Sequence, residues 1–305
     1  MAHGPSRRGV LAALLSLLWL AACAPAPEPP VVTPKLEAAA LVASDGRRLP
    51  LRRWGPEGAP KAVVLALHGF GGFGLVFQGL GERLAGEGYA LLAIDQRGFG
   101  DDPDRGSWPG GGRLVADARD FIRAADDADP DLPRFLLGVS MGGAVAIDAA
   151  AGRSDLAGLV LAAPAARGPA GRQPFLDALL GLGARVLPWL GLAVEHDDPR
   201  LTERANRLFR NDPRVVRRMT VAAYDGILGL ADDAFKAAPR ITAPTLLLHG
   251  TADPILPEAA IDGLQAVMKA PTRRVVLEGG IHNLLNQKDV DAAGLILAFL
   301  ADPKG

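Results

Sequence analysis

The chain has 305 residues, a formal net charge of −1 and 49% hydrophobic residues. This length suits one large α/β domain with an insertion, or two small domains, and the hydrophobic content is enough to bury a sizeable core. The near-neutral charge argues against nucleic-acid binding, which needs a basic face. The 37 glycines and 25 prolines follow no period, which excludes a fibrous repeat.

The first 22 residues have the pattern of an export signal. Two arginines at residues 7–8 precede an apolar run over residues 10–20. This run is shorter than the apolar helix that a membrane-spanning segment needs. The letters LAAC that end at Cys23 resemble a bacterial lipobox, in which the peptide is cut before a cysteine whose sulfur carries a diacylglycerol. We therefore expect residues 1–22 to be a lipoprotein signal peptide and Cys23, the single cysteine, to be the lipidated residue.

A lipoprotein of this kind is anchored to a membrane of the bacterial cell envelope and faces the periplasm. Ala24 is not an obvious signal for retention in the inner membrane, so the outer membrane is favoured. An ordinary signal peptide or an uncleaved anchor is the alternative, and the paired arginines leave the twin-arginine export route open.

Residues 23–35 are predicted to form an extended tether, because five prolines fall within residues 24–34 and proline cannot continue a helix. The folded domain is expected to start at residue 36. Its first element is predicted to be a β-hairpin over residues 38–54, with Asp-Gly at residues 45–46 as the turn.

Beyond the hairpin, short apolar runs alternate with helical stretches. The runs are apolar on every residue, which is typical of parallel strands with helices on both faces of the sheet. The expected strands are residues 62–67, 90–94, 135–139, 156–161, 245–248 and 274–277. The expected helices are residues 75–87, 112–127, 141–151, 257–269 and 289–301. The alternation predicts a doubly wound α/β domain with a mostly parallel sheet.

One stretch breaks the alternation, because it contains no convincing strand. Its helical segments are residues 173–182, 184–192, 200–209 and 213–230. A stretch of about 75 residues is too long for a simple loop between two core strands. We therefore expect an inserted helical cap at residues 165–240, and an α/β core formed by residues 36–164 and 241–305.

A candidate nucleophile lies where a predicted strand meets a predicted helix. Residues 138–143 read GVSMGG and match G-x-S-x-G in the strand–turn–helix context that this pattern requires. Glycines are needed because the serine sits on a sharp, strained turn, where a side chain two residues away would clash. The turn presents the Ser140 hydroxyl above the sheet, at the positive end of the following helix.

A serine hydroxyl needs a base to become a good nucleophile. Among the five histidines, only His282 lies on the loop after the last predicted strand, as the chain order serine, acid, histidine demands. The acid should follow the preceding strand, where Asp253 lies, and its carboxylate would hold the imidazole in the required tautomer. Alternatively, His282 is a surface-loop histidine and Asp253 a turn residue.

Two backbone N–H groups are needed to bind the negative charge that develops on a carbonyl oxygen. The N–H of Met141, just after the candidate nucleophile, supplies one. The second is expected from Phe70 in the glycine-rich loop HGFGGFG at residues 68–74. This loop is not a phosphate-binding loop, because no G-K-[ST] follows it.

Five motifs in this order resemble the α/β-hydrolase superfamily: HGFGG, DQRGFG, GVSMGG, HGTAD and GGIHN. More narrowly, they are similar to the branch that contains monoacylglycerol lipases, lysophospholipases and serine aminopeptidases, over roughly residues 37–303. The resemblance implies Ser140, Asp253 and His282 as catalytic triad, Phe70 and Met141 as oxyanion hole, and neither metal nor cofactor. The acidic stretch DDPD at residues 101–104 departs from many members of the branch.

The cap segment 175–192 is unusually apolar, and in this branch such helices form a lid over the serine. We expect Phe73, Leu187 and Trp189 to line an acyl pocket, although such side chains could instead pack the cap onto the core. The expected activity is hydrolysis of single-chain carboxylic esters, such as monoacylglycerols or lysophospholipids, through an acyl-enzyme.

Two alternatives stay open. One is an aminopeptidase-type activity, in which the acidic cap residues Glu195, Asp197 and Asp198 would bind a free amine. The other is an envelope lipoprotein that uses the same fold without catalysis.

Overall fold

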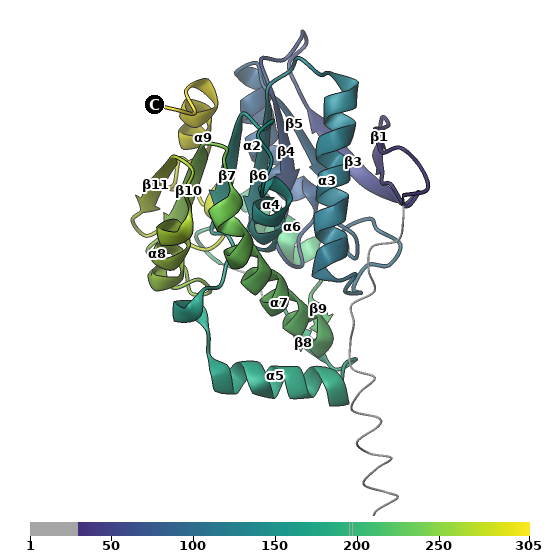
Figure 1. Cartoon of the computed structure of the whole chain (residues 1–305), viewed down its shortest axis with the longest axis vertical. Coiled ribbons are helices and arrows are strands. Elements are labelled where there is room, and N and C mark those ends of the chain that lie inside the picture. The colour runs from purple at the N-terminus through teal and green to yellow at the C-terminus, as the bar shows by residue number, and fades with distance from the viewer. Residues whose placement is uncertain (1–29, 195, 197) are drawn as a thin grey trace, which may run out of the picture.

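A nine-stranded sheet forms the centre of the molecule, with the strand order β1-β2-β3-β5-β4-β6-β7-β10-β11 (Figure 1). The structure, a computed structural model, describes residues 30–305 except 195 and 197. The expected signal peptide, Cys23 and most of the tether therefore lie outside the described residues, as do Glu195 and Asp197.

Strands β4, β5, β6, β7, β10 and β11 run parallel to one another. Strands β1, β2 and β3 form one edge of the sheet, where each pairs antiparallel with its neighbours. Their bounds are β1 (Lys35–Leu36), β2 (Ala40–Val42), β3 (Arg48–Trp54), β4 (Val63–Leu67), β5 (Ala90–Ile94), β6 (Arg134–Val139), β7 (Gly158–Ala162), β10 (Thr245–Gly250) and β11 (Thr272–Leu277). Each expected core strand is present, which confirms the doubly wound α/β class.

Both faces of the sheet are covered, as the unbroken apolar runs predict. On β4, Leu65 and Leu67 pack into one hydrophobic cluster, and Val64 and Ala66 pack into another on the opposite face. The first face carries α3 (Gly111–Ala128), α4 (Met141–Ala150) and α8 (Glu258–Val267), and the second carries α2 (Gln78–Gly86) and α9 (Ala292–Ala301) (Figure 1). The described residues also form the short 3-10 helices η2 (Gly74–Phe77), η3 (Pro169–Gly171), η4 (Ala238–Arg240) and η5 (Leu284–Asn286).

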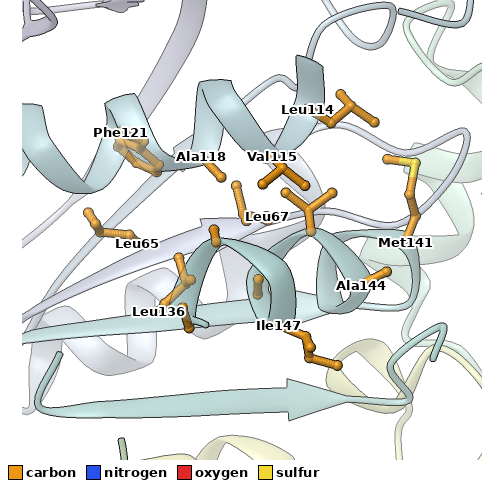
Figure 2. Packing of buried hydrophobic residues seen from close by; sticks show 14 of the residues in the cluster. Leu65, Leu67, Leu114, Val115, Ala118, Phe121, Leu136, Met141, Ala144 and Ile147 are labelled. Carbon is orange, nitrogen blue, oxygen red and sulfur yellow. The ribbon is translucent and has the colours of Figure 1, made fainter. Parts of the chain in front are cut away.

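The packing of α3 on α4 fixes the helix that follows Ser140. Figure 2 shows Val115, Ala118 and Phe121 of α3 on the side that faces α4, while Ile147 of α4 points the other way, toward the sheet. All of these side chains are buried. The three- and four-residue spacing on α3 puts its apolar side chains on one face, so α4 is held between this face and the sheet.

The cap contains both helices and strands. Its elements are α5 (Pro174–Val186), β8 (Gly191–Ala193), α6 (Glu203–Asn211), β9 (Arg218–Thr220) and α7 (Val221–Ala237). Strands β8 and β9 pair antiparallel, so the expectation of helices alone was wrong. The helix expected at residues 184–192 is absent, because Pro188 cannot continue α5, and the chain turns there into β8.

The N-terminal hairpin is present as β2 and β3, with Gly46 at φ +81° in the turn. The part of the tether that is described does not hang free. The N–H groups of Val31 and Val32 both donate to the Ser44 carbonyl, at 2.7 and 3.0 Å, and β1 pairs with β2. Residues 31–35 thus belong to the fold. Within the described part of the chain, no helix combines the length and apolarity needed to cross a bilayer.

Candidate active site

Ser140 lies on the turn between β6 and α4, with φ 52° and ψ −116°, a backbone conformation that residues other than glycine rarely adopt. A Cβ on Gly138 would stand 2.3 Å from the carbonyl oxygen of Gly142, and a Cβ on Gly142 would stand 2.1 Å from that of Leu67. The two glycines therefore let the turn close tightly, and the turn directs Ser140 out of the sheet.

Ser140, His282 and Asp253 form a hydrogen-bonded line. The Ser140 Oγ lies 2.8 Å from His282 Nε2, and His282 Nδ1 lies 2.8 Å from Asp253 Oδ2. In the tautomer that serves both contacts, Nδ1–H donates to the carboxylate and Nε2 accepts from the hydroxyl. The structure thus brings together the three residues that the sequence places 142 and 29 positions apart.

Both oxygens of the Asp253 carboxylate accept hydrogen bonds. Its Oδ1 accepts from the N–H groups of Ile255 at 2.8 Å and Leu256 at 3.0 Å, and its side chain has no exposed surface. Burial by itself would raise the pKa of Asp253, but the hydrogen bonds from His282 and the two N–H groups lower it below the usual value. Asp253 is therefore ionised at neutral pH and positioned to orient the imidazole.

The loop after β4 lies against Ser140 because β4 and β6 are neighbours where the strand order reverses, the place where ligands bind in open α/β sheets. A Cβ on Gly69 would stand 3.3 Å from the Ser140 Cβ. The N–H groups of Phe70 and Met141 donate to no other residue within the described chain. Both remain available for an oxyanion beside Ser140.

His68 braces this loop, a role that the sequence did not reveal. The side chain is fully buried, its Nε2 accepts from the Gln96 N–H at 2.9 Å, and its Nδ1 lies 2.9 Å from the Gly69 carbonyl oxygen. Burial lowers the pKa of His68 to about 4. The neutral ring donates through Nδ1 and accepts through Nε2, so it holds Gly69, the residue before Phe70.

A cavity of about 770 Å³ opens at Ser140 and runs between the core and the cap. Apolar side chains dominate its wall: Phe70, Val76, Phe77, Val139, Leu176, Val194, Phe209, Ile227, Leu228, Ile255, Leu256, Ile281 and Leu285. A smaller polar set includes His196, Asp198, Asn283 and Asn286. The cavity can take an apolar chain with a polar group at one end.

The structure does not place Phe73, Leu187 or Trp189 on this wall, contrary to the expectation from sequence. Phe73 is wholly buried beneath the loop, in a cluster with Phe209 and Ile281. Leu187 and Trp189 are 44% and 70% exposed. The reason is the orientation of α5, which packs on α7 and leaves the end of its chain on the outer surface of the cap.

Of the three acidic residues proposed for amine binding, the structure describes Asp198, which is already paired. Asp198 accepts from the guanidinium of Arg200 at 2.8 and 3.0 Å. Asp177, the other carboxylate on the wall, pairs with Arg167 at 2.7 Å. An amine bound by either of these two described carboxylates would have to break its ion pair.

Comparison with known proteins now supplies the family. The model of the family described as serine aminopeptidase, S33, matches residues 58–289. The chain belongs to this family. Human monoglyceride lipase is 30% identical over 260 residues, which cover 81% of this chain and 84% of the relative. Monoacylglycerol lipase of Mycolicibacterium smegmatis is 27% identical over 258 residues, 80% of this chain and 89% of the relative.

Solved structures agree on the fold of this family member. The crystal structure of Paleococcus ferrophilus monoacylglycerol lipase is 26% identical, covers 84% of this chain and 99% of its own, and gives a TM-score of 0.68. A soluble variant of monoglyceride lipase from Saccharomyces cerevisiae, at 16% identity, covers 90% and 96% with a TM-score of 0.69, a likeness of fold alone. The chain has the α/β-hydrolase fold.

Proposed function

We propose that this protein is a serine hydrolase that cleaves monoacylglycerols or similar single-chain carboxylic esters. The observation that carries the proposal is the hydrogen-bonded line of Ser140, His282 and Asp253 at the end of a largely apolar cavity. The family, and relatives named as monoglyceride lipases, support the same substrate class.

The geometry provides for each step of the reaction. Ser140 Oγ attacks the ester carbon while its proton passes to His282 Nε2, and the N–H groups of Phe70 and Met141 bind the oxyanion. Collapse of the tetrahedral intermediate breaks the ester C–O bond, and the leaving alkoxide takes the proton from His282. A water molecule, deprotonated by His282, then attacks the acyl-enzyme and releases the fatty acid and Ser140.

The wall favours an acyl chain over a peptide. Each CH₂ group buried gains about 0.8 kcal/mol, so an apolar cavity rewards chain length until it is full. The two described carboxylates on the wall, Asp177 and Asp198, are already paired with arginines. A scaffold without catalysis would not need the strained turn at Ser140 or the aligned imidazole.

We also propose that the protein is an exported lipoprotein anchored through Cys23, with α5 turned toward lipid. The described residues that support this lie on α5, where Phe175, Leu179, Leu182 and Val186 are each more than half exposed. Their spacing of four, three and four residues puts them on one helix face. Leu176 of the same helix reaches the cavity wall, so this face borders the cavity. Such a surface suits a protein that takes its substrate from a membrane.

The activity is tested with purified enzyme on monolauroylglycerol, p-nitrophenyl laurate, p-nitrophenyl acetate and alanine p-nitroanilide. We expect both laurate esters to be cleaved with a higher kcat/KM than acetate, and the anilide not to be cleaved. Ser140→Ala should lower ester hydrolysis by about 10⁴-fold or more and abolish labelling by a fluorophosphonate. Faster cleavage of the anilide than of any ester would favour the peptidase.

The anchor is tested separately by intact-mass analysis of protein extracted from the membrane. A mature chain that begins at a diacylated Cys23 is expected, and Cys23→Ser should release the protein from the membrane fraction. An unmodified N-terminus would refute the lipoprotein proposal without touching the proposed chemistry.

A further inference from the structure

Phe73 lies three residues after Phe70 on the oxyanion loop, and two guanidinium groups flank it. Arg52 of β3 lies 5.1 Å from the ring centroid and Arg214 of the cap lies 4.6 Å from it. The ring has no exposed surface. Guanidinium groups near an aromatic ring attract it through the charge distribution of the ring, and more strongly where water is excluded.

Asp101 joins these two arginines. Its Oδ2 accepts from Arg52 at 2.8 Å and from Arg214 at 3.3 Å. Arg214 is held in turn by a bidentate pair with Asp212, at 2.9 and 2.8 Å. This contact explains part of the acidic stretch at residues 101–104, because its first carboxylate bridges the core and the cap.

The core side of this arrangement reaches the loop through Asp95. The buried carboxylate of Asp95 accepts from the N–H of Gly74 at 2.8 Å and from the N–H of Asp101 at 2.8 Å, and it pairs with Arg52. The end of the oxyanion loop and the bridging aspartate are therefore fixed to one carboxylate.

The cap side reaches the loop through the backbone two residues after Arg214. The N–H of Val216 donates to the carbonyl oxygen of Gly71 at 2.9 Å. Gly71 follows Phe70 directly and has φ +79°. The Gly71 carbonyl belongs to the peptide that follows Gly71, two peptide units after the one that contains the Phe70 N–H, so a cap residue holds the loop directly beside the Phe70 segment.

We infer that the cap segment 212–216 positions the oxyanion hole, and that Arg214 is the positioning residue that holds this segment on the loop. The inference rests on the proposed function. The cap then does more than cover the cavity, because the Phe70 N–H is correctly placed only while Arg214 contacts Phe73 and Asp101. Arg214 is not among the described residues that line the cavity, so its loss should slow the chemical step and leave substrate binding intact.

The test compares Arg214→Met with wild type on p-nitrophenyl butyrate, with active sites counted by fluorophosphonate titration. Loss of one oxyanion donor costs about 10²–10³ in kcat, and its displacement should cost less. We expect kcat per active site to fall about tenfold to a hundredfold, with KM within twofold of wild type. The affinity for a trifluoromethyl ketone, which forms an oxyanion adduct on Ser140, should fall by a similar factor.

A matched control removes another ion pair of the cap, between Arg207 and Glu203 on the exposed face of α6. Their charged groups lie 3.5 Å apart. Arg207→Met should leave kcat and inhibitor affinity unchanged. Asp101→Asn, at a side chain 46% exposed, decides the matter if Arg214→Met does not fold. It should lower kcat about threefold or more at constant KM.

A kcat within twofold of wild type in the folded Arg214→Met enzyme, or in Asp101→Asn if that variant must decide, would overturn the inference. So would a loss explained entirely by fewer titratable sites. The proposed function fails in a different way, because then Ser140→Ala would keep its activity whatever Arg214→Met does.

Discussion

Asp253→Asn gives the sharpest test of the triad, because the structure dictates which way the amide must point. Oδ1 of Asp253 accepts from two backbone N–H groups and Oδ2 faces His282 Nδ1. An asparagine must keep its oxygen toward the N–H groups of Ile255 and Leu256, since an NH₂ group there would face two donors. Its NH₂ group therefore faces His282.

The amide then forces the wrong tautomer on the imidazole. Nδ1 of His282 must accept from the new NH₂ group, so the ring proton moves to Nε2, which can no longer accept from Ser140 Oγ. The same substitution in a related constellation costs about 10⁴ in kcat, which corresponds to about 5 kcal/mol of barrier. The fold should survive, because the turn that Asp253 closes keeps both hydrogen bonds.

The assay is hydrolysis of p-nitrophenyl butyrate at pH 7.5, with thermal unfolding measured in parallel. Asp148 of α4 forms an ion pair with Arg119 of α3, and Asp148→Asn is the matched control, which should retain wild-type kcat. A folded Asp253→Asn enzyme with more than a tenth of wild-type kcat would refute the tautomer argument.

Three further predictions follow from contacts in the core and cavity. Gly142→Ala places a Cβ 2.1 Å from the Leu67 oxygen, so urea unfolding should show a loss of about 1–3 kcal/mol, and an unchanged midpoint would contradict the close approach. Burial lowers the pKa of His68 from 6.5 to about 4. Between these pH values His68 is therefore protonated in the unfolded chain and neutral in the folded one, so acid favours unfolding. Unfolding free energy should therefore drop by about 3 kcal/mol between these pH values, a slope that His68→Gln should lack. Ile227→Trp, on the cavity wall, should lower turnover of p-nitrophenyl laurate at least tenfold more than that of acetate, whereas exposed Trp189→Ala should change both alike.

The core strands and helices were predictable because each carries its own signal. The run VVLAL of β4 is apolar at every position, and burial on both faces of the sheet demands this. The hydrogen-bonded arrangement of Ser140, His282 and Asp253 was predictable for a different reason. The turn at Ser140 requires glycines at fixed positions, and Asp253 and His282 each follow a strand whose place in the sheet is set by the fold.

The errors share a physical origin in contacts between distant segments. Strands β8 and β9 have three residues each and are stabilised by pairing with one another, across 24 intervening residues, so neither shows a local pattern. The place of Phe73 depends on Arg214, which is 141 positions away. Which side of α5 faces water depends on its packing against α7, and an apolar helix of this kind looks the same from sequence whichever face is covered.

The antiparallel edge of the sheet has a mechanical consequence under the proposal that the chain is anchored through Cys23. A pull from the tether is first resisted by the bonds of Val31 and Val32 to Ser44, and then by the two-residue pairing of β1 with β2. Four strands separate β1 from β6, which leads to Ser140. Under such a pull we expect the hydrogen bonds to Ser44 to break first and the pairing of β1 with β2 next, before the strands nearer Ser140 separate. If the proposed anchor at Cys23 is correct, a pull from the membrane would break these contacts at the edge of the sheet before it disturbed the turn at Ser140.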